Sequence, residues 1–518
     1  MPRRCLAALL LLLAALADPT NAQTEPGGGI QIRVTLPSGS AVVSGRLIVF
    51  MTNDPQPSGL LLPGFQPNER WWIAAREVTD LEPGHTVTID RTAAAVPSAI
   101  HRAPRGDYQF MALLDVDHDA NYEEISDGDL RSLVVPAKGL DPSAATAVEL
   151  NLTERHRSSA TLRPEGELVD VVSPSLSAFW GRPVHMRQIV ILPPGYRSSS
   201  SRYPTVYLTH GFGGTLSGSF GPRLTDLIVT QMANGKLPPM IWVLLEQAVA
   251  SGTHEFADSA NNGPWGTALT KELIPELERR YRMDARPSGR FLNGHSSGGW
   301  ATAWLQVTHP DVFGGTWSTS PDPVDFHSFT NVDLYTADNL YRDVRGNPTR
   351  LLRGIETPAG TMEAFAKREA VLGEYGGQMA SFEWVFSPKG DDGRPVPLFN
   401  RTTGRIDRSV AEYWISRFDI SRLLTTRARE LAPQLRGKLH FIVGTADTFY
   451  LDVPIRRLEV ALQELAYDAK FTYLPDRDHF NLYEGDVLTR IAQQMYDVAR
   501  PRSKWTPSVE PTVAPLMH

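Results

Sequence analysis

The sequence predicts an α/β fold in which a mostly parallel sheet carries helices on both faces, preceded by a small β-sandwich. Three observations predict it. The chain has 518 residues, which is more than one ordinary domain needs. From about residue 28 to residue 152, apolar residues recur at every second position, as in half-buried strands. After about residue 180, short apolar runs alternate with segments of helical periodicity, as in parallel strands joined by helices.

The first part of the chain, residues 23–153, is expected to hold the β-sandwich. Its apolar positions alternate with polar ones, and a cluster rich in Pro and Gly at 55–64 interrupts the pattern. The alternating positions are Ile30, Ile32, Val34 and Leu36; Leu47, Val49 and Met51; Tyr108, Phe110, Ala112 and Leu114; and Val148, Leu150 and Leu152. We interpret these strands as an immunoglobulin-like domain, followed by a linker at 154–180.

The second part, residues 181–500, is expected to hold the larger sheet. Its predicted strands are 188–192, 205–209, 241–245, 290–293, 439–443 and 471–474. The segment 267–283 repeats apolar residues at helical spacing towards its end, and Pro275 predicts a kink or a split there. A C-terminal tail is expected at 501–518.

Composition and the first residues bear on the setting of the protein. The formal net charge of -7 offers no basic surface for nucleic acid. Arg3 and Arg4, an apolar run at 6–16 and small residues up to Ala22 predict a signal peptide at 1–22, and no later stretch is long and apolar enough to span a membrane. We therefore expect export to the periplasm or the extracellular space. The one cysteine, Cys5, lies in this leader, so no disulfide or thiol nucleophile is expected after cleavage.

The strongest motif is G-H-S-S-G at 294–298. It has the form G-x-S-x-G, a predicted strand leads into it, and a helix-compatible stretch at 300–307 follows it. Such a context places the serine on a sharp strand-to-helix turn, as an α/β-hydrolase nucleophile requires. Side chains at Gly294 and Gly298 would collide with the neighbouring strand and helix in that turn. We predict that Ser296 is a nucleophile.

A glycine-rich loop, H-G-F-G-G at 210–214, follows the predicted strand 205–209. A loop at this position offers a backbone N–H to an oxyanion. We predict the N–H of Phe212 as this donor, with Gly213 as the alternative, and the N–H of Ser297 as the second donor. An ordinary strand-to-helix turn would have a similar composition.

A serine nucleophile needs a base and an acid, in the chain order serine, acid, histidine. His479 follows the last predicted strand, whereas His440 lies within a strand, so His479 is the predicted base. Asp447 directly follows the predicted strand 439–443, 32 residues before His479, and is the predicted acid. Asp452 is its nearest rival.

Nine stretches between residues 190 and 480 carry a family resemblance. They are 190–196, 210–214, 258–259, 263–266, 272–275, 294–299, 320–322, 444–447 and 479–480. In them the chain resembles the putative-esterase (esterase-D-like) branch of the α/β-hydrolases, which includes feruloyl, acetyl-xylan and siderophore esterases. The resemblance implies hydrolysis of a small-molecule or carbohydrate-linked ester through an acyl-enzyme, without a cofactor. It maps Ser296, Asp447 and His479 onto the catalytic triad.

The segment between Trp317 and Lys438 departs from the family's pattern. It holds about 120 residues, far more than an ordinary connection, with a helix-like part at 361–372 and a loop-like part at 387–404. We expect a lid over the active site at about 322–435. Because of this lid, the substrate of this chain cannot be inferred from the substrates of family members. An acyltransferase and a catalytically inactive binding protein of the same fold stay open as alternatives.

Two further groups carry weaker predictions. Asp115, Asp117 and Asp119 alternate as in a calcium loop, but an EF-hand's Gly and Glu are missing from their places, so a polar turn explains them better.

Three tryptophans, Trp180, Trp265 and Trp317, are candidates for an aromatic substrate pocket, with core packing as the alternative.

Overall fold

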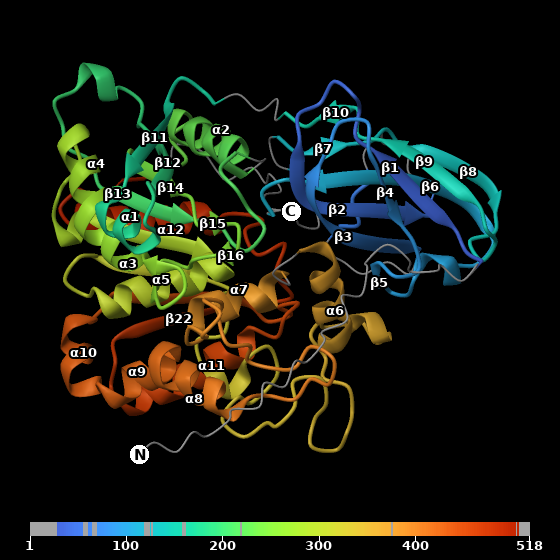
Figure 1. The fold of residues 1–518 in the computed structure, drawn as a ribbon. Coiled ribbons are helices and arrows are strands. Elements are labelled where there is room, and N and C mark those ends of the chain that lie inside the picture. The colour runs from blue at the N-terminus through green and yellow to red at the C-terminus, as the bar shows by residue number, and fades with distance from the viewer. Residues whose placement is uncertain are drawn as a thin grey trace, which may run out of the picture.

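The computed structural model describes residues 28–54, 61–64, 70–118, 125, 128–157, 162–217, 220–373, 377–503 and 505–506. The expected leader at 1–22 and most of the expected tail at 501–518 lie outside the described residues. Figure 1 shows a β-rich part, coloured blue to cyan, beside a larger part of mixed strands and helices, coloured green to red.

The described residues of the N-terminal part form two sheets. One has the order β10-β7-β6-β2-β3-β5, with β8 also on β6, and the other has the order β4-β1-β9. Neighbouring strands are antiparallel except β1 and β9, which are parallel. The strands are β1 (Gln31–Thr35), β2 (Val43–Thr52), β3 (Trp71–Leu81), β4 (Thr86–Ile89), β5 (Ala94–Val96), β6 (Gly106–Asp115), β7 (Leu130–Arg131), β8 (Val135–Leu140), β9 (Ala147–Asn151) and β10 (Glu154–Arg155).

Strand β2 is buried on both faces, although its alternating pattern predicts one buried face. Leu47 and Val49 belong to an apolar core shared by the two sheets. Ile48 and Phe50 belong to a different core, which includes Phe365 from the long segment between β20 and β21. The second face is buried because this distant segment packs against it, a contact that local periodicity does not encode.

The prediction of a linker at 154–180 is wrong over much of this range. Strand β11 (Gly166–Val172) pairs with β12 along its whole length, and helix α1 (Pro174–Trp180) follows it. β11 is the edge strand of the large sheet, where only Val169 is buried while Leu168 is 59% exposed. An edge strand buries few side chains, so its sequence lacks the apolar run that marks the inner strands.

The large sheet has eight strands in the order β11-β12-β14-β13-β19-β20-β21-β22. Pairs from β14 to β22 are parallel, and β11 and β12 are antiparallel to their neighbours. Its remaining strands are β12 (His185–Ile191), β13 (Thr205–Thr209), β14 (Ile241–Leu245), β19 (Arg290–His295), β20 (Gly315–Thr319), β21 (Leu439–Gly444) and β22 (Ala469–Leu474). All six strands predicted from apolar runs are present, so the predicted mostly parallel sheet is confirmed.

Helices cover both faces of this sheet, as predicted. Val206 and Leu208 of β13 pack in a core with α2 (Phe220–Ala233) and α12 (Val487–Ala499). Tyr207, between them, points to the other face and packs in a core with α4 (Ile274–Arg280) and α5 (Ser297–Thr308).

The split predicted at Pro275 is present. Helix α3 (Trp265–Ala268) passes through a π-helical turn (Leu269–Leu273) into α4, whose second residue is Pro275. Proline has no N–H to donate to a helical hydrogen bond. The wider π-helical turn just before Pro275 breaks the regular helix there, so this donor is not required.

The described residues between β20 and β21 form five α-helices: α6 (Met362–Leu372), α7 (Gly377–Phe386), α8 (Arg408–Phe418), α9 (Ile420–Thr426) and α10 (Ala428–Gln434). We call the segment between β20 and β21 the insertion. The helix predicted at 361–372 is confirmed by α6. Helix α6 packs against β3 and β5, so the insertion joins the β-rich part to the α/β part (Figure 1). Helix α11 (Asp452–Glu464) follows β21.

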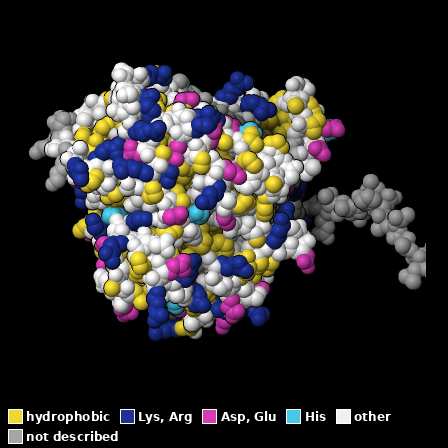
Figure 2. All heavy atoms as spheres, turned by 90° about the vertical axis from the view of Figure 1, so that its left-hand side faces the viewer, with side chains coloured by type: hydrophobic (Ala, Val, Ile, Leu, Met, Phe, Trp, Pro, Cys, Tyr) yellow, Lys and Arg dark blue, Asp and Glu magenta, His cyan; other side chains and the backbone are white. Residues whose placement is uncertain are grey.

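The surface carries both signs of charge. On the face shown in Figure 2, Lys and Arg side chains are interspersed with Asp and Glu side chains rather than gathered into one field. Within the described part of the chain, no helix has both the length and the apolar character that a membrane crossing requires.

Candidate active site

Ser296 lies at the turn between β19 and α5, as the motif predicts. Its backbone has φ 58° and ψ −124°, which residues other than glycine rarely adopt. Hydrogen bonds hold the turn: its N–H donates to the carbonyl of Thr319 at 3.1 Å, and its carbonyl accepts from the N–H groups of Trp300 at 3.0 Å and Asp322 at 3.1 Å. The turn is strained but fixed by its neighbours on both sides.

Glycines permit the close packing around this turn. A Cβ on Gly294 would lie 2.2 Å from the carbonyl oxygen of Gly298, and a Cβ on Gly298 would lie 2.5 Å from the carbonyl oxygen of His210. Both distances are far below van der Waals contact, so the collisions predicted at these two positions are confirmed. Gly211 packs on the serine itself, since its Cβ would lie 3.1 Å from the Cβ of Ser296.

The glycine-rich loop after β13 lies against the turn and is held by His210. The ring of His210 lies 2.7 Å from Glu246 through Nε2 and 2.8 Å from the carbonyl of Gly211 through Nδ1. Phe212 lines the same cavity as Ser296, and Ser297 is the first residue of α5, where backbone N–H groups are free of helical partners. The two predicted N–H donors therefore come from segments that meet at the serine.

His479 and Asp447 are brought into direct contact. The Nδ1 of His479 donates to Oδ2 of Asp447 at 3.0 Å, and the two side chains are 5% and 0% exposed. Asp447 follows β21 and His479 follows β22, and these strands are neighbours in the sheet. His479 also lines the cavity of Ser296. The structure thus gathers all three residues that the sequence nominates.

The surroundings of Asp447 keep it ionised. Burial alone would raise the pKa of Asp447, but the charge and hydrogen bond of His479 and the N–H groups of Phe449 and Leu451 lower it overall. Those N–H groups donate to Oδ1 at 2.9 and 3.2 Å, which leaves Oδ2 for the histidine. A fixed, charged acceptor of this kind orients an imidazole.

The rival acid, Asp452, has a different partner. Its Oδ1 accepts from Nη2 of Arg353 at 2.6 Å. Arg353 comes from the insertion, and its Nε donates to the carbonyl oxygen of Asp447 at 2.9 Å. Asp452 therefore helps to hold the loop of Asp447 in place, while Asp447 itself makes the contact with His479.

Asp322 is a residue that our sequence reasoning did not nominate. Its Oδ1 lies 3.4 Å from the Oγ of Ser296, and its Oδ2 accepts from the Oγ of Ser297 at 2.6 Å. Burial, the largest effect, raises the pKa of Asp322 to about 6. The same rule that finds Asp447, an acid directly after a strand, would have found it, because it follows β20 closely.

A second buried acid, Glu255, interacts with Asp322. Glu255 is fully buried, and burial followed by the negative charge of Asp322 raises its pKa well above the ordinary value. Two buried carboxyl groups near each other do not both ionise easily. The site thus contains an acid of lowered pKa, Asp447, at the histidine and an acid of raised pKa, Asp322, at the serine, and Asp322 interacts with Glu255, whose pKa is also raised.

A small cavity of about 80 Å³ opens at Ser296. The described residues that line it are Phe212, Ser296, Asp322, Thr330, Leu351, Phe365, Gln378, Met379, Phe382, Phe449, Leu451, His479 and Phe480. Seven of these, Asp322, Thr330, Leu351, Phe365, Gln378, Met379 and Phe382, belong to the insertion. The insertion therefore forms part of the wall around the serine.

The three candidate pocket tryptophans are not among the described residues that line this cavity. Trp180 and Trp265 both donate through Nε1 to the carbonyl of Asn262, at 3.2 and 3.0 Å. Trp317 is fully buried in β20 and donates to Gln494 at 2.6 Å. The pocket expectation is corrected: these rings fix the fold around the site.

The predicted calcium candidates are only partly described, since Asp119 lies outside the described residues. Asp115 and Asp117 bring carboxylate oxygens within 4.8 Å of each other and of Asp129, which the sequence pattern did not include.

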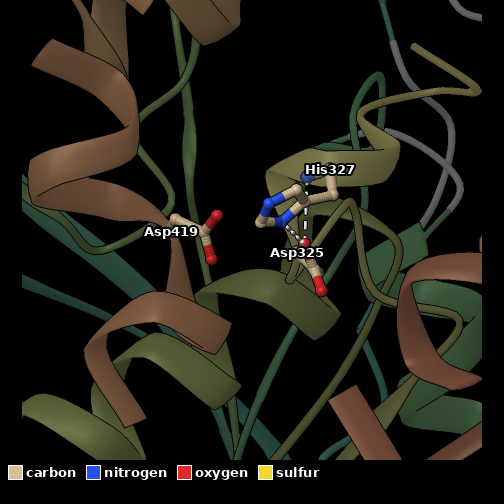
Figure 3. A group of neighbouring side chains, drawn as sticks. All are labelled: Asp325, His327 and Asp419. Atoms are coloured by element: carbon tan, nitrogen blue, oxygen red, sulfur yellow. Dashed lines mark hydrogen bonds and ion pairs between the residues drawn. The ribbon is translucent and has the colours of Figure 1, made fainter. Parts of the chain in front are cut away.

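Another group with metal-ligating side chains is Asp325, His327 and Asp419 (Figure 3), whose ligand atoms also lie within 4.8 Å. Asp325 accepts from Nδ1 of His327 at 2.8 Å and pairs with Arg457 at 3.3 Å. Asp419 accepts from the N–H of Phe326 at 3.0 Å and caps α9. Protein donors thus already use these carboxylates, which explains the cluster without an ion.

Comparisons with known proteins identify the family of the α/β part. Residues 181–486 match the family described as putative esterase. An endo-1,4-beta-xylanase/feruloyl esterase of Xylanibacter ruminicola is 28% identical over 147 residues, 26% of this chain and 20% of that protein. An esterase of Mycobacterium tuberculosis is 36% identical over 113 residues, 21% of this chain and 23% of that protein. The matches thus span about a fifth to a quarter of the length of these relatives.

Among solved structures, a ferulic acid esterase is 18% identical and covers 65% of this chain and 98% of its own, with a TM-score of 0.38. An S-formylglutathione hydrolase of Agrobacterium tumefaciens is 14% identical and covers 66% and 95%, with a TM-score of 0.35. The family match spans more than half of the chain and contains Ser296, Asp447 and His479. The chain belongs to the putative esterase family.

Proposed function

We propose that this protein hydrolyses carboxylic esters, with Ser296 as nucleophile, His479 as base and Asp447 as the acid that orients the base. The observation that carries the proposal is the buried 3.0 Å contact between His479 and Asp447 at a cavity that Ser296 and His479 both line. Membership of the esterase family supports the class of reaction.

In the first step, the Oγ of Ser296 attacks the ester carbonyl carbon while Nε2 of His479 takes the hydroxyl proton. The carbonyl oxygen becomes an oxyanion, stabilised by the N–H groups of Phe212 and Ser297. The bond to the alcohol oxygen then breaks, the alcohol leaves with the proton from His479, and the acyl group stays on the serine.

In the second step, water attacks the acyl-enzyme and gives its proton to His479. The tetrahedral intermediate collapses, the carboxylic acid leaves, and the proton returns to Ser296. Asp447 stays ionised throughout and stabilises the imidazolium that forms in each step, which fits the lowered pKa of Asp447.

The substrate and the setting belong to the proposal as well. A small-molecule or carbohydrate-linked ester is the proposed substrate, supported by the name feruloyl esterase that a curated relative carries. Export is proposed from the leader-like residues 1–22. The two N-terminal sheets share one apolar core, which supports a β-sandwich.

The test is turnover of p-nitrophenyl acetate by Ser296→Ala and by a matched control, Ser200→Ala, at an exposed serine. Loss of the nucleophile lowers kcat by at least about 10⁴-fold, whereas the control keeps wild-type kcat. Turnover near the wild-type rate in folded Ser296→Ala would overturn the assignment. Product analysis with an added alcohol separates hydrolysis from acyl transfer.

A further inference from the structure

A second, larger cavity lies between the β-rich part and the insertion. Its volume is about 570 Å³, within the range of small-molecule sites. Trp71 and Ile73 of β3 form one side, and Leu352, Ala364 and Phe365 of the insertion form another. Trp71, Ile73, Leu352 and Phe365 are all at most 6% exposed, so the inner walls are apolar and set in the core.

The charged residues at this cavity are matched by partners. Lys367 donates to Oε1 of Glu363 at 2.6 Å, and Arg342 donates to Oε2 of the same residue at 2.9 Å. Arg368 donates to the carbonyl of Gly64. Lys367 is exposed and Glu363 is partly exposed, whereas Arg368 is buried and its guanidinium already donates to Gly64. Because the inner walls are otherwise apolar, the interior favours a neutral hydrocarbon over a charged ligand.

The larger cavity adjoins the cavity of Ser296. Phe365 is the one side chain among the described residues that lines both. Two consecutive residues line different cavities: Leu351 lines the cavity at the serine, and Leu352 lines the larger cavity. The two spaces are thus separated by the thickness of a few side chains.

We propose that the larger cavity binds an aliphatic chain of the ester substrate, which passes Phe365 from the scissile ester at Ser296. The inference rests on the proposed function and names its substrate class: esters with a medium-length or long hydrocarbon arm. The cavity at the serine, at about 80 Å³, holds little beyond the reacting group. A flexible chain gains from the larger space because each methylene removed from water tightens binding roughly fourfold.

The test compares kcat/KM for p-nitrophenyl decanoate with that for p-nitrophenyl acetate. Ala364→Trp fills the larger cavity, and Ala370→Trp places the same ring on an exposed position of the same helix. We expect the decanoate-to-acetate ratio to fall at least about tenfold in Ala364→Trp and to stay at the wild-type value in Ala370→Trp. A second filling variant, Ala359→Phe, checks the result from another segment of the wall.

If folded Ala364→Trp and Ala359→Phe change kcat/KM neither for the decanoate ester nor for decyl acetate relative to the short ester, the inference is overturned while ester hydrolysis by Ser296 stays intact. Binding of decanoate and of 1-decanol to Ser296→Ala, measured by calorimetry, tests the cavity without turnover: Ala364→Trp on this background must weaken at least one of them, and unchanged affinity for both contradicts the proposal. Decyl acetate, which carries its long chain on the alcohol side of the ester, is the second test substrate. A selective loss with the decanoate ester assigns the cavity to the acyl chain, and a selective loss with decyl acetate assigns it to the alcohol.

Discussion

The Oδ1 of Asp322 lies 3.4 Å from the Oγ of Ser296, so the proposed nucleophile has a buried carboxyl group as its neighbour. This carboxyl differs from Asp447 in its electrostatic environment. Burial raises the pKa of Asp322 to about 6, whereas the contact with His479 outweighs burial and lowers the pKa of Asp447. Two acids within one site are thus pushed apart in pKa by their surroundings, as acids with different roles commonly are.

Asp322→Asn is expected to make stability less dependent on pH. The folded pKa of Asp322, about 6, lies above its ordinary value of 3.8, so the folded state holds a proton between these values that the unfolded state releases. Stability from this group is therefore present below about pH 4 and is lost as the pH rises through 6, by on the order of 3 kcal/mol. The asparagine keeps an acceptor for Ser297 and carries no charge.

Thermal melts of wild type and Asp322→Asn at pH 4 and pH 7 measure this difference. The variant should gain stability relative to wild type at pH 7, and an exposed control, Asp391→Asn, should show no such change. An equal difference between variant and wild type at both pH values would contradict the buried-acid account of Asp322.

Asp447→Asn is expected to lower kcat by about 10³- to 10⁴-fold, because the amide no longer selects the imidazole tautomer or stabilises its cation. The matched control is Asp452→Asn, whose carboxyl pairs with Arg353 rather than with His479. Its kcat should fall less than about tenfold. A larger loss in Asp452→Asn than in Asp447→Asn would reverse the assignment of the acid.

Gly298→Ala is expected to destabilise the fold by about 3 kcal/mol or more. Its Cβ would lie 2.5 Å from the carbonyl oxygen of His210 and 2.6 Å from that of Thr209, and neither backbone atom can move without shifting β13. Gly39→Ala is the control, since no atom lies within 4 Å of its Cβ. Urea unfolding of both variants measures this change. A wild-type unfolding midpoint for Gly298→Ala would contradict the close packing around the Ser296 turn.

Arg353→Ala is expected to lower kcat by about 10- to 100-fold with little change in KM for a short ester. The arginine holds the carbonyl of Asp447 at 2.9 Å, so its loss misplaces the acid without touching substrate. Arg345→Ala, at an exposed arginine of the insertion, is the control. A rise in KM with unchanged kcat would mean that Arg353 acts in binding instead.

Local patterns were sufficient for much of the fold and site. The apolar runs of β13 and β14 match the observed strands, and Ser296, Asp447 and His479 all follow strands whose carboxyl ends meet at one edge of a parallel sheet. Motif context and chain order therefore carried these assignments.

What the sequence did not predict depends on contacts between distant segments. The second face of β2 is buried only by the insertion, which is distant in the sequence. Strand β11 was not predicted because an edge strand buries few side chains and so lacks an apolar run. Trp317 was ambiguous because a core ring and a pocket ring have the same local sequence. Glu255 becomes notable only when the fold brings it into interaction with Asp322.

The central claim is that Ser296 forms a covalent acyl-enzyme, and its most direct test is peptide mass spectrometry after treatment with a fluorophosphonate. We expect one phosphonate adduct, on the peptide that contains Ser296, in wild type and in Ser200→Ala. We expect loss of that adduct in Ser296→Ala and after prior incubation with an ester whose acyl-enzyme is hydrolysed slowly. An adduct on another residue of the folded protein, together with full esterase turnover, would contradict it.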